Sequence, residues 1–218
     1  MFRFIRNLFS PVLSDTIIKK YIDKGLLITT PINDIQFQPN SVDLTLDSKV
    51  KILQHSYYHN YQKYQNRIID RIDNYIDIRF PIKYIDKDFA DGKTASGENL
   101  KCYVLQPHEF VLMSSKEILN IPNGIIAFVQ GRSSIARLGI QIEQAGLIDS
   151  GFEGNITLEI FNESDERIML FEGMRIAQVY FYKSQYSKYL YGENKNKYYK
   201  QLGPTESRIF KDFNMEEN

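Results

Sequence analysis

The sequence predicts a mainly β fold, an all-β barrel or sandwich, from three observations. From Lys101 onward, short apolar or alternating stretches recur with turn-forming residues between them, as successive strands do. Few stretches have helical periodicity. No segment repeats at a constant spacing, so a solenoid or propeller is not expected. The expected strands are Cys102–Leu105, Phe110–Ser114, Ile125–Val129, Ile140–Ile142, Asn155–Phe161, Arg167–Leu170 and Ile176–Tyr182.

The composition bounds the class of protein. With 218 residues, one domain spanning 1–218 is the simplest interpretation. Lysine plus arginine (27) balances aspartate plus glutamate (27), so no overall charge attracts nucleic acid or an anionic membrane. A single cysteine, Cys102, excludes an intrachain disulfide, and no apolar run approaches the roughly twenty residues of a membrane span. We therefore expect a cytoplasmic protein without a nucleic-acid or membrane partner.

The N-terminal part predicts an arm, a helix and two strands. Residues 1–12 begin with a short basic and apolar stretch, either a flexible extension or an amphipathic arm. Ser14 and Asp15 are typical of a helix start, an apolar stripe follows, and Gly25 is typical of a helix end. Short strands are then expected at Leu26–Thr30 and Ser41–Leu46.

Two segments lack a core-forming pattern. Residues of about 53–100 are polar and rich in tyrosine. They indicate either an insertion lying over the barrel or a surface on which nucleic-acid bases stack, and the aspartates among them favour the insertion. Residues 88–100 have the glycine, serine and aspartate content of an exposed loop. The C-terminal segment, about 183–218, is rich in lysine and tyrosine, and either is a disordered tail or closes over an anionic ligand.

Basic and hydroxyl side chains gather directly after one predicted strand. The apolar run Ile125–Val129 is consistent with a buried strand, which delivers Arg132 to a strand end. Ser133 and Ser134 follow, and Arg137 closes the group. Arginine forks and hydroxyls suit phosphate oxygens, although an Arg-Ser-Ser sequence alone is common in loops.

Two carboxylates follow in the same stretch. Asp149 lies in an Asp-Ser-Gly sequence that by itself is typical of a turn. Glu159 lies in the middle of an alternating strand, on the face opposite Ile156, Leu158 and Ile160. It is therefore either an ordinary exposed strand glutamate or part of a polar pocket. Combined with the upstream cluster, the carboxylates indicate a nucleotide site with hydrolytic chemistry beside it.

Zinc-dependent base deamination fits the sequence poorly. That chemistry uses a His-x-Glu and a Pro-Cys-x-x-Cys arrangement to activate water. The chain has one cysteine, and its three histidines, His55, His59 and His108, form no such pattern. A metal-free route needs a carboxylate that shuttles protons and groups that hold the water and the developing charge. Glu159 and Arg137 fit those roles in kind.

The sequence resembles the dCTP deaminase branch of the dUTPase superfamily. The motifs that carry the resemblance are GRSSIARLGI followed by AGLIDSGFEGNITLEIFN, then EGMRIAQVYF (172–181), KYYKQLGPTESR (197–208), LSDTIIKKYIDKGLLI (13–28) and QPNSVDLTL (38–46). They cover most of the chain outside 1–12 and about 50–100. The resemblance implies a dUTPase-like distorted β-barrel of the β-clip or jelly-roll type, with a short N-terminal helix and an insertion, assembled as a homotrimer.

The resemblance also implies roles for individual residues. Glu159 corresponds to the general base, Arg137 helps to position the water, and Asp149 meets the sugar 3′-hydroxyl and, in dUTP-cleaving relatives, orients the attacking water. The other expected substrate-binding residues are Arg132, Ser133, Ser134, Ala145, Gln178, Tyr191, Lys197 and Gln201. No protein metal ligand is expected, because Mg²⁺ is held mostly by the substrate triphosphate and water. Family sites lie between subunits, which allows the Arg-Ser-Ser cluster and the carboxylates to belong to different chains.

One departure from the family pattern concerns the expected product. Ala145 lies 13 positions after Arg132, which is one fewer than in the family's deaminases and equals the dUTPase spacing. Gln144 stands where deaminases carry threonine, and AGLIDSGF looks like bifunctional or dUTP-cleaving members. We expect deamination of dCTP to dUTP and ammonia, which either ends there or continues to dUMP and diphosphate. The alternatives are a dUTPase without deaminase activity and an inactive nucleotide-binding regulator.

Overall fold

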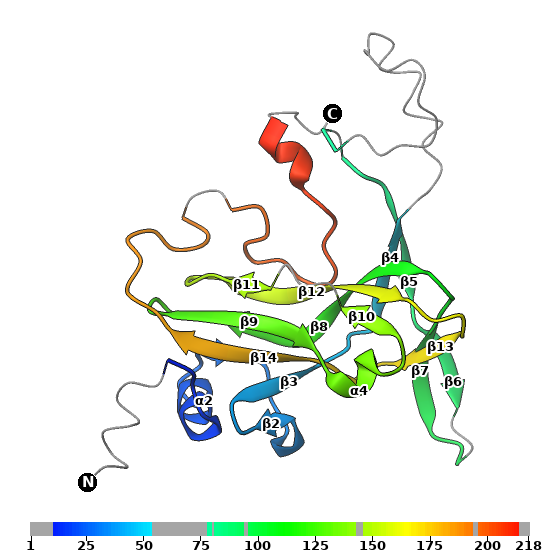
Figure 1. The fold of residues 1–218 in the computed structure, drawn as a ribbon, viewed down its shortest axis with the longest axis horizontal. Helices are drawn as coiled ribbons and strands as arrows, with labels where there is room; N and C mark the ends of the chain where they lie inside the picture. Colours follow the sequence, from blue (N-terminus) through cyan, green and yellow to red (C-terminus); the bar gives the residue numbers. More distant parts are fainter. Residues whose placement is uncertain are drawn as a thin grey trace.

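Antiparallel strands are the main secondary structure of the described residues, as the sequence predicts (Figure 1). A computed structural model describes residues 11–53, 78–79, 81–93, 96–142, 146–193 and 196–213. Most of the expected arm (1–10), half of the expected insertion (54–77) and Ala145 lie outside the described residues. The described strands form two large sheets and one small sheet.

The largest sheet has the strand order β10–β12–β8–β4–β5, and β1 also pairs with β8. Its central strand, β8, is long because Val111 to Ser115 are all buried, so both faces of the strand are covered. The strands are β1 (Leu27–Ile28), β4 (Lys49–Leu53), β5 (Tyr84–Asp88), β8 (Phe110–Asn120), β10 (Ile140–Ile142) and β12 (Glu153–Asn162).

The second sheet has the order β11–β9–β14–β3–β2. Alternate residues of its two central strands, such as Val129 and Phe181, point into the core, where Phe181 is fully buried. The strands are β2 (Phe37–Gln38), β3 (Ser41–Thr45), β9 (Ile125–Gly131), β11 (Leu147–Ile148) and β14 (Arg175–Lys183). The small sheet contains β6 (Ala90–Lys93), β7 (Asn99–Leu105) and β13 (Ile168–Phe171).

The described helices are short. They are α2 (Asp15–Ile22), α4 (Ser133–Ala136) and two 3₁₀ turns, η1 (Asp34–Gln36) and η2 (Ile209–Phe213). The expected N-terminal helix is confirmed: Ile18 is buried against the core, and Gly25 follows with φ 72°. Ser14 occupies the N-cap position, but its side chain makes no capping hydrogen bond and instead contacts the Thr16 hydroxyl at 3.0 Å.

Two local predictions are wrong. The loop expected at 88–100 contains β6, which pairs with β7, and Phe89 is buried because it reaches the core beside this hairpin. The strict alternation expected from Ile156 is interrupted by a register shift between Asn155 and Thr157, so Ile156 is only partly buried. Beyond the shift the alternation holds, since Leu158 is buried and Glu159 is not.

Candidate active site

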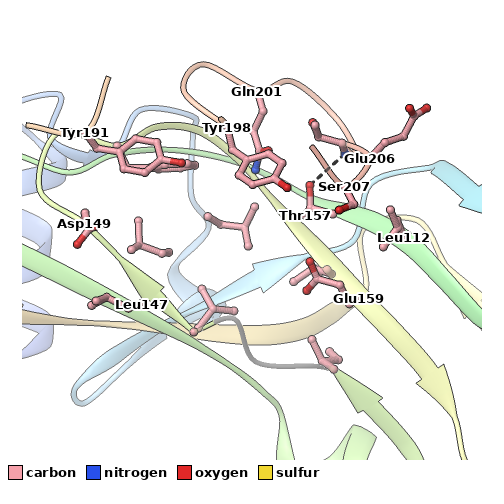
Figure 2. A pocket seen from close by; sticks show the side chains of 18 of the residues that line it. Leu112, Leu147, Asp149, Thr157, Glu159, Tyr191, Tyr198, Gln201, Glu206 and Ser207 are labelled. Carbon is pink, nitrogen blue, oxygen red and sulfur yellow. Dashed lines mark hydrogen bonds between the residues drawn. The ribbon is translucent and has the colours of Figure 1, made fainter. Parts of the chain in front are cut away.

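A cavity of about 440 Å³ lies between β12 and the C-terminal segment (Figure 2). Its walls come from the middle of β12, from β11 and the turn after it, from β5 and β8, and from the tail, with Val129 of β9 and Ile142 of β10 also in the lining. The lining includes Tyr84, Phe110, Leu112, Leu147, Asp149, Ile156, Thr157, Glu159, Tyr191, Tyr198, Gln201, Thr205, Glu206 and Ser207. Among the polar residues of the lining, Tyr84, Thr157 and Glu159 lie on strands and Asp149 lies in the turn after β11, while the tail supplies Tyr191, Tyr198, Gln201, Thr205, Glu206 and Ser207.

Glu159 stands in this cavity, as the pocket interpretation of the sequence expects. Its register partner on β8 is Leu112, which in turn pairs with Lys51 on β4. Lys51 pairs with Asp86 on β5. Because directly paired residues project to the same face of a sheet, these side chains form one row across four strands. Glu159 is partly exposed while its neighbour Leu158 is buried, so the carboxylate is aimed at the cavity and not at the core.

Asp149 lines the same cavity from the turn after β11. Its backbone carbonyl accepts a hydrogen bond from the Phe152 amide at 3.2 Å, which fixes the turn. Burial raises the pKa of the Tyr191 phenol, and the negative charge of Asp149 adds to the rise while the charge of Lys197 opposes it. Asp149, Tyr191 and Lys197 are thus close enough to interact electrostatically.

The C-terminal segment is docked on its own chain. The Tyr191 amide donates to the Ser150 carbonyl at 2.9 Å, and its ring lies 5.5 Å from the ring of Phe152. The backbone of Gln201 accepts from the Asn155 amide at 3.0 Å, and its side-chain amide donates to the Asn155 carbonyl at 2.7 Å. In Figure 1 this segment runs above β11 and β12. Of the two expectations for the tail, the described residues agree with closure over a site.

Glycines allow this close docking. A Cβ atom on Gly151 would lie 2.7 Å from the Leu190 Cβ and 2.8 Å from the Tyr191 nitrogen, and one on Gly154 would lie 2.7 Å from the Gln201 carbonyl oxygen. Both glycines have positive φ angles, 91° and 142°. The sequence suggests that the backbone here turns sharply or closely approaches a ligand, and in the structure it closely approaches the tail.

The basic cluster does not line the cavity of its own chain. The exposed residues Ser133, Ser134 and Arg137 lie on or just after α4, and Arg132 precedes it. The Arg132 guanidinium lies 3.3 Å from the buried carboxylate of Asp43 and donates to the Arg175 carbonyl. Two further expected residues are also absent from the lining: Gln178, half-buried on β14, and Lys197, whose ammonium pairs with Asp212.

A model of the family described as dCTP deaminase-like matches residues 12–184. The chain belongs to this family. A protein of Sulfurihydrogenibium sp. named "dCTP deaminase, dUMP-forming" is 41% identical over 202 residues, 92% of this chain and 98% of that protein. A protein of Persephonella marina with the same name is 36% identical over 205 residues, 92% of this chain and 98% of that protein.

A solved structure shares the fold. The 2′-deoxycytidine 5′-triphosphate deaminase from Agrobacterium tumefaciens has a TM-score of 0.56 and is 22% identical. The match covers 80% of this chain and 49% of that chain, so the present chain spans about half the length of that structure. The mainly β fold with a short N-terminal helix that the sequence predicts is therefore confirmed.

The buried Asp43 binds two arginine side chains, a role that the sequence analysis does not predict. Its carboxylate is 1% exposed and accepts from Arg175 at 3.0 Å, in addition to its contact with Arg132. The signal was present, because Asp43 is an acidic residue inside the apolar strand SVDLTL, and a buried charge needs a partner. The contact between Arg132 and Asp43 therefore attaches the start of α4 to β3.

Two further observations concern partners. Within the described residues, no group of three or more His, Cys, Asp or Glu side chains is arranged to hold a metal ion. No helix in the described part of the chain is long and apolar enough to cross a membrane.

Proposed function

We propose that the chain is an enzyme that deaminates dCTP hydrolytically and then cleaves the product to dUMP and diphosphate. The observation that carries the proposal is the cavity, in which Glu159 and Asp149 stand at separate places beneath a docked tail. Two carboxylates at separate positions suit two hydrolytic steps, one at the base and one at the triphosphate. The 41% identical relative named as dUMP-forming supports the same pair of steps.

Glu159 acts as the proton shuttle of the first step. It takes a proton from water as the oxygen attacks C4 of the pyrimidine, and returns a proton to the amino group, which leaves as ammonia. Arg137 positions the water and stabilises the developing charge. In the second step Asp149 orients a water in line with the α-phosphorus, and the P–O bond to the β-phosphate breaks to release diphosphate.

The complete site forms between two copies of the chain. Glu159 and Asp149 line the cavity, while Ser133, Ser134 and Arg137 are exposed elsewhere on the same chain. Leu138, next to Arg137, is 55% exposed and becomes covered in an assembly in which another copy packs against α4. We infer a homotrimer in which α4 of one copy reaches the cavity of the next.

The outer face of the second sheet supports this assembly. Phe128 on β9 pairs with Leu147 on β11 and with Tyr180 on β14, which forms an apolar row. The Phe128 ring lies 6.0 Å from the Tyr180 ring and 5.5 Å from that of Tyr182, and Leu147 is 50% exposed. An aromatic cluster on a sheet face is typical of a subunit interface.

The triphosphate and its Mg²⁺ bind together in this proposal. Mg²⁺ is part of the substrate complex, held by phosphate oxygens and water, with Asp149 as the carboxylate nearest to the reacting phosphate. Groups that contact the nucleotide come from both copies: Arg132, Ser133, Ser134, Arg137, Ala145 and Gln178 on one side, and Tyr191, Lys197 and Gln201 on the other. The proposal takes residues 1–218 as one domain.

A dUTPase without deaminase activity is the second candidate. The spacing of 13 positions between Arg132 and Ala145, which equals the dUTPase spacing, favours it. Ammonia and diphosphate release from dCTP and from dUTP separate the candidates. Both products from dCTP support the proposal, diphosphate from dUTP without ammonia from dCTP supports the dUTPase, and neither product supports an inactive regulator.

Mixed assemblies test whether the site is shared between copies. Glu159→Gln and Arg137→Ala should each abolish ammonia release, because each removes one half of every site. When the two variants are unfolded and refolded together at equal amounts, about a quarter of the sites should join an intact Glu159 to an intact Arg137. Ammonia release should therefore recover to about a quarter of the wild-type rate. A mixture as inactive as its components, with mixed trimers present by mass spectrometry, would refute the shared site.

A further inference from the structure

Beyond the predicted catalytic residues, one ion pair joins the tail to the sheet that carries Glu159. The Lys51 ammonium on β4 lies 2.8 Å from the Glu206 carboxylate in the tail and 2.7 Å from the Asp86 carboxylate on β5. Lys51 is only 18% exposed, whereas Asp86 is 77% exposed. Glu206 itself lines the cavity, so this contact stands at the cavity wall.

The tail crosses the sheet from β12 toward β4. The Lys200 amide donates to the Glu153 carbonyl at 2.8 Å, and the Gly203 amide donates to the Asn155 side-chain oxygen at 3.1 Å. The next contact is the Thr205 amide, which donates to the hydroxyl of Thr157 at 3.1 Å. All of these partners lie on β12. Only then does the chain pass over β8, and Glu206 meets Lys51 two strands away from Glu159.

The position of Lys51 in the sheet makes the contact relevant to the site. Lys51, Leu112 and Glu159 are paired in sequence across β4, β8 and β12, so they occupy one row on one face. Neighbouring strands are about 4.8 Å apart, which places Lys51 roughly 10 Å from Glu159 along the row. In Figure 2, Glu206 and Ser207 of the tail lie next to the β12 side chain Thr157, and Glu159 lies below them.

The surroundings of Lys51 favour its charged form. Burial lowers the pKa of Lys51, but the hydrogen bonds and charges of Asp86 and Glu206 outweigh this effect, so its pKa is raised overall. A partly buried ammonium with two carboxylates keeps a fixed geometry better than a freely exposed lysine does. It also neutralises Glu206, a third carboxylate on a cavity that already holds Glu159 and Asp149.

We propose that Lys51 is a positioning residue, which clamps Glu206 and thereby fixes residues 205–207 as the cavity wall opposite Glu159. The clamp acts on the end of the tail beyond its β12 contacts at Gly203 and Thr205. Its consequence for catalysis rests on the proposed deamination. The effect of the clamp on the tail does not depend on that function, because the ion pair exists without a nucleotide.

Hydrogen exchange of the ligand-free protein tests the clamp directly. The Gly203 and Thr205 amides report the docking of the tail, because each donates to a side chain on β12. Lys51→Met and Glu206→Gln should each speed their exchange by about fivefold, and the double variant should go no further, since both changes remove one interaction. Asp86→Asn is the matched control: it removes the other partner of Lys51 without touching the tail, and should change exchange by less than about twofold.

The same variants have a kinetic readout. If the wall orients the substrate, Lys51→Met should lower kcat for ammonia release by at least about fivefold with little change in KM, because a misplaced group costs more in the transition state than in binding. The charge-exchanged pair Lys51→Glu with Glu206→Lys should recover part of the loss. Tail exchange unchanged by Lys51→Met and by Glu206→Gln, or increased equally by Asp86→Asn, would overturn the clamp. Faster exchange with an unchanged kcat would overturn its positioning role.

The experiments distinguish a failure of the proposed deamination from a failure of the clamp between Lys51 and Glu206. A wild-type protein that releases no ammonia from dCTP refutes the proposed deamination, while the exchange measurement still decides the clamp. Should Lys51→Met fail to fold, Glu206→Gln gives the same information, because Glu206 belongs to the tail and lies outside the sheet.

Discussion

Replacing Gly154 with alanine tests whether docking of the tail depends on glycine in β12. A Cβ atom at this position would lie 2.7 Å from the Gln201 carbonyl oxygen and 3.0 Å from the Gln201 nitrogen. Ordinary contacts begin at 3.4 Å, so the tail backbone must retreat by about 0.7 Å. The hydrogen bonds on either side, from Lys200 to Glu153 at 2.8 Å and from Asn155 to Gln201 at 3.0 Å, would then be lost or weakened.

The magnitude follows from these two bonds. Each contributes about 1 kcal/mol net, so docking of the tail should weaken by about 2 kcal/mol, or about thirtyfold in the docked-to-undocked ratio. Hydrogen exchange of the Asn155 amide measures this ratio, and the Michaelis constant for dCTP should rise with it. Gly173→Ala is the matched control, because Gly173 also has a positive φ of 77° but a Cβ there meets nothing within 4 Å.

The comparison between these two glycines decides the outcome. Both variants place alanine at a positive φ, 142° at Gly154 and 77° at Gly173, so both carry backbone strain of about 1–3 kcal/mol and should lower thermal stability. Only Gly154→Ala should release the tail. If Asn155 exchanges equally fast in the two variants, the close approach at Gly154 does not limit docking, and the reasoning from the 2.7 Å contact is wrong.

Three further predictions follow from the site and its surroundings. Glu159→Gln should lower ammonia release by at least about a hundredfold, and Asp149→Asn should suppress diphosphate release from dUTP more than Glu159→Gln does; equal effects on both products would contradict separate roles. Truncation after Lys188 should leave a folded protein with weak nucleotide binding and little turnover, which circular dichroism and dCTP titration measure, and unchanged kinetics would exclude a lid. The hydrogen bond from Lys116 lowers the pKa of Glu172 below its usual 4.5, so the pair stabilises the fold at neutral pH and loses this contribution as the pH falls through the lowered pKa. Urea unfolding of Lys116→Met should therefore show a deficit of at most about 0.5 kcal/mol at pH 7 that vanishes in acid, and a deficit that is the same at both pH values would contradict the pairing.

Strands with strong apolar patterns could be predicted closely from the sequence. The expected strand Ile140–Ile142 coincides with β10, and the expected Ile125–Val129 differs from β9 only by two residues at its end. Their side chains enter the core, so the apolar positions in the sequence correspond directly to buried positions in the structure. The structure likewise places Glu159 in a cavity, because the alternation of β12 holds from Leu158 onward.

The exposed edge strands β5 and β6 could not be predicted in the same way. The strand β5 is mostly exposed and charged, and β6 contains Asp91 and Gly92 in a hairpin whose side chains are mainly in solvent. Backbone pairing forms such strands, and pairing leaves no mark in the hydrophobic pattern. Phe89, buried between them, was the one apolar signal in a stretch that otherwise has the composition of a loop.

Candidate residues that lie close together in the sequence do not all lie in the same site of one chain. Arg137 and Glu159 are 22 positions apart, but β9, which leads to the first, and β12, which carries the second, belong to different sheets. The motif therefore contributes Asp149 and Glu159 to the cavity and leaves Arg137 exposed outside it. If α4 of each copy meets the cavity of the next, the contact is heterologous, and a ring of copies must close for every site to be complete. In that ring, the surface that completes each site is also the surface that joins neighbouring copies. The exposed Leu138 and the aromatic face around Phe128 both belong to this surface.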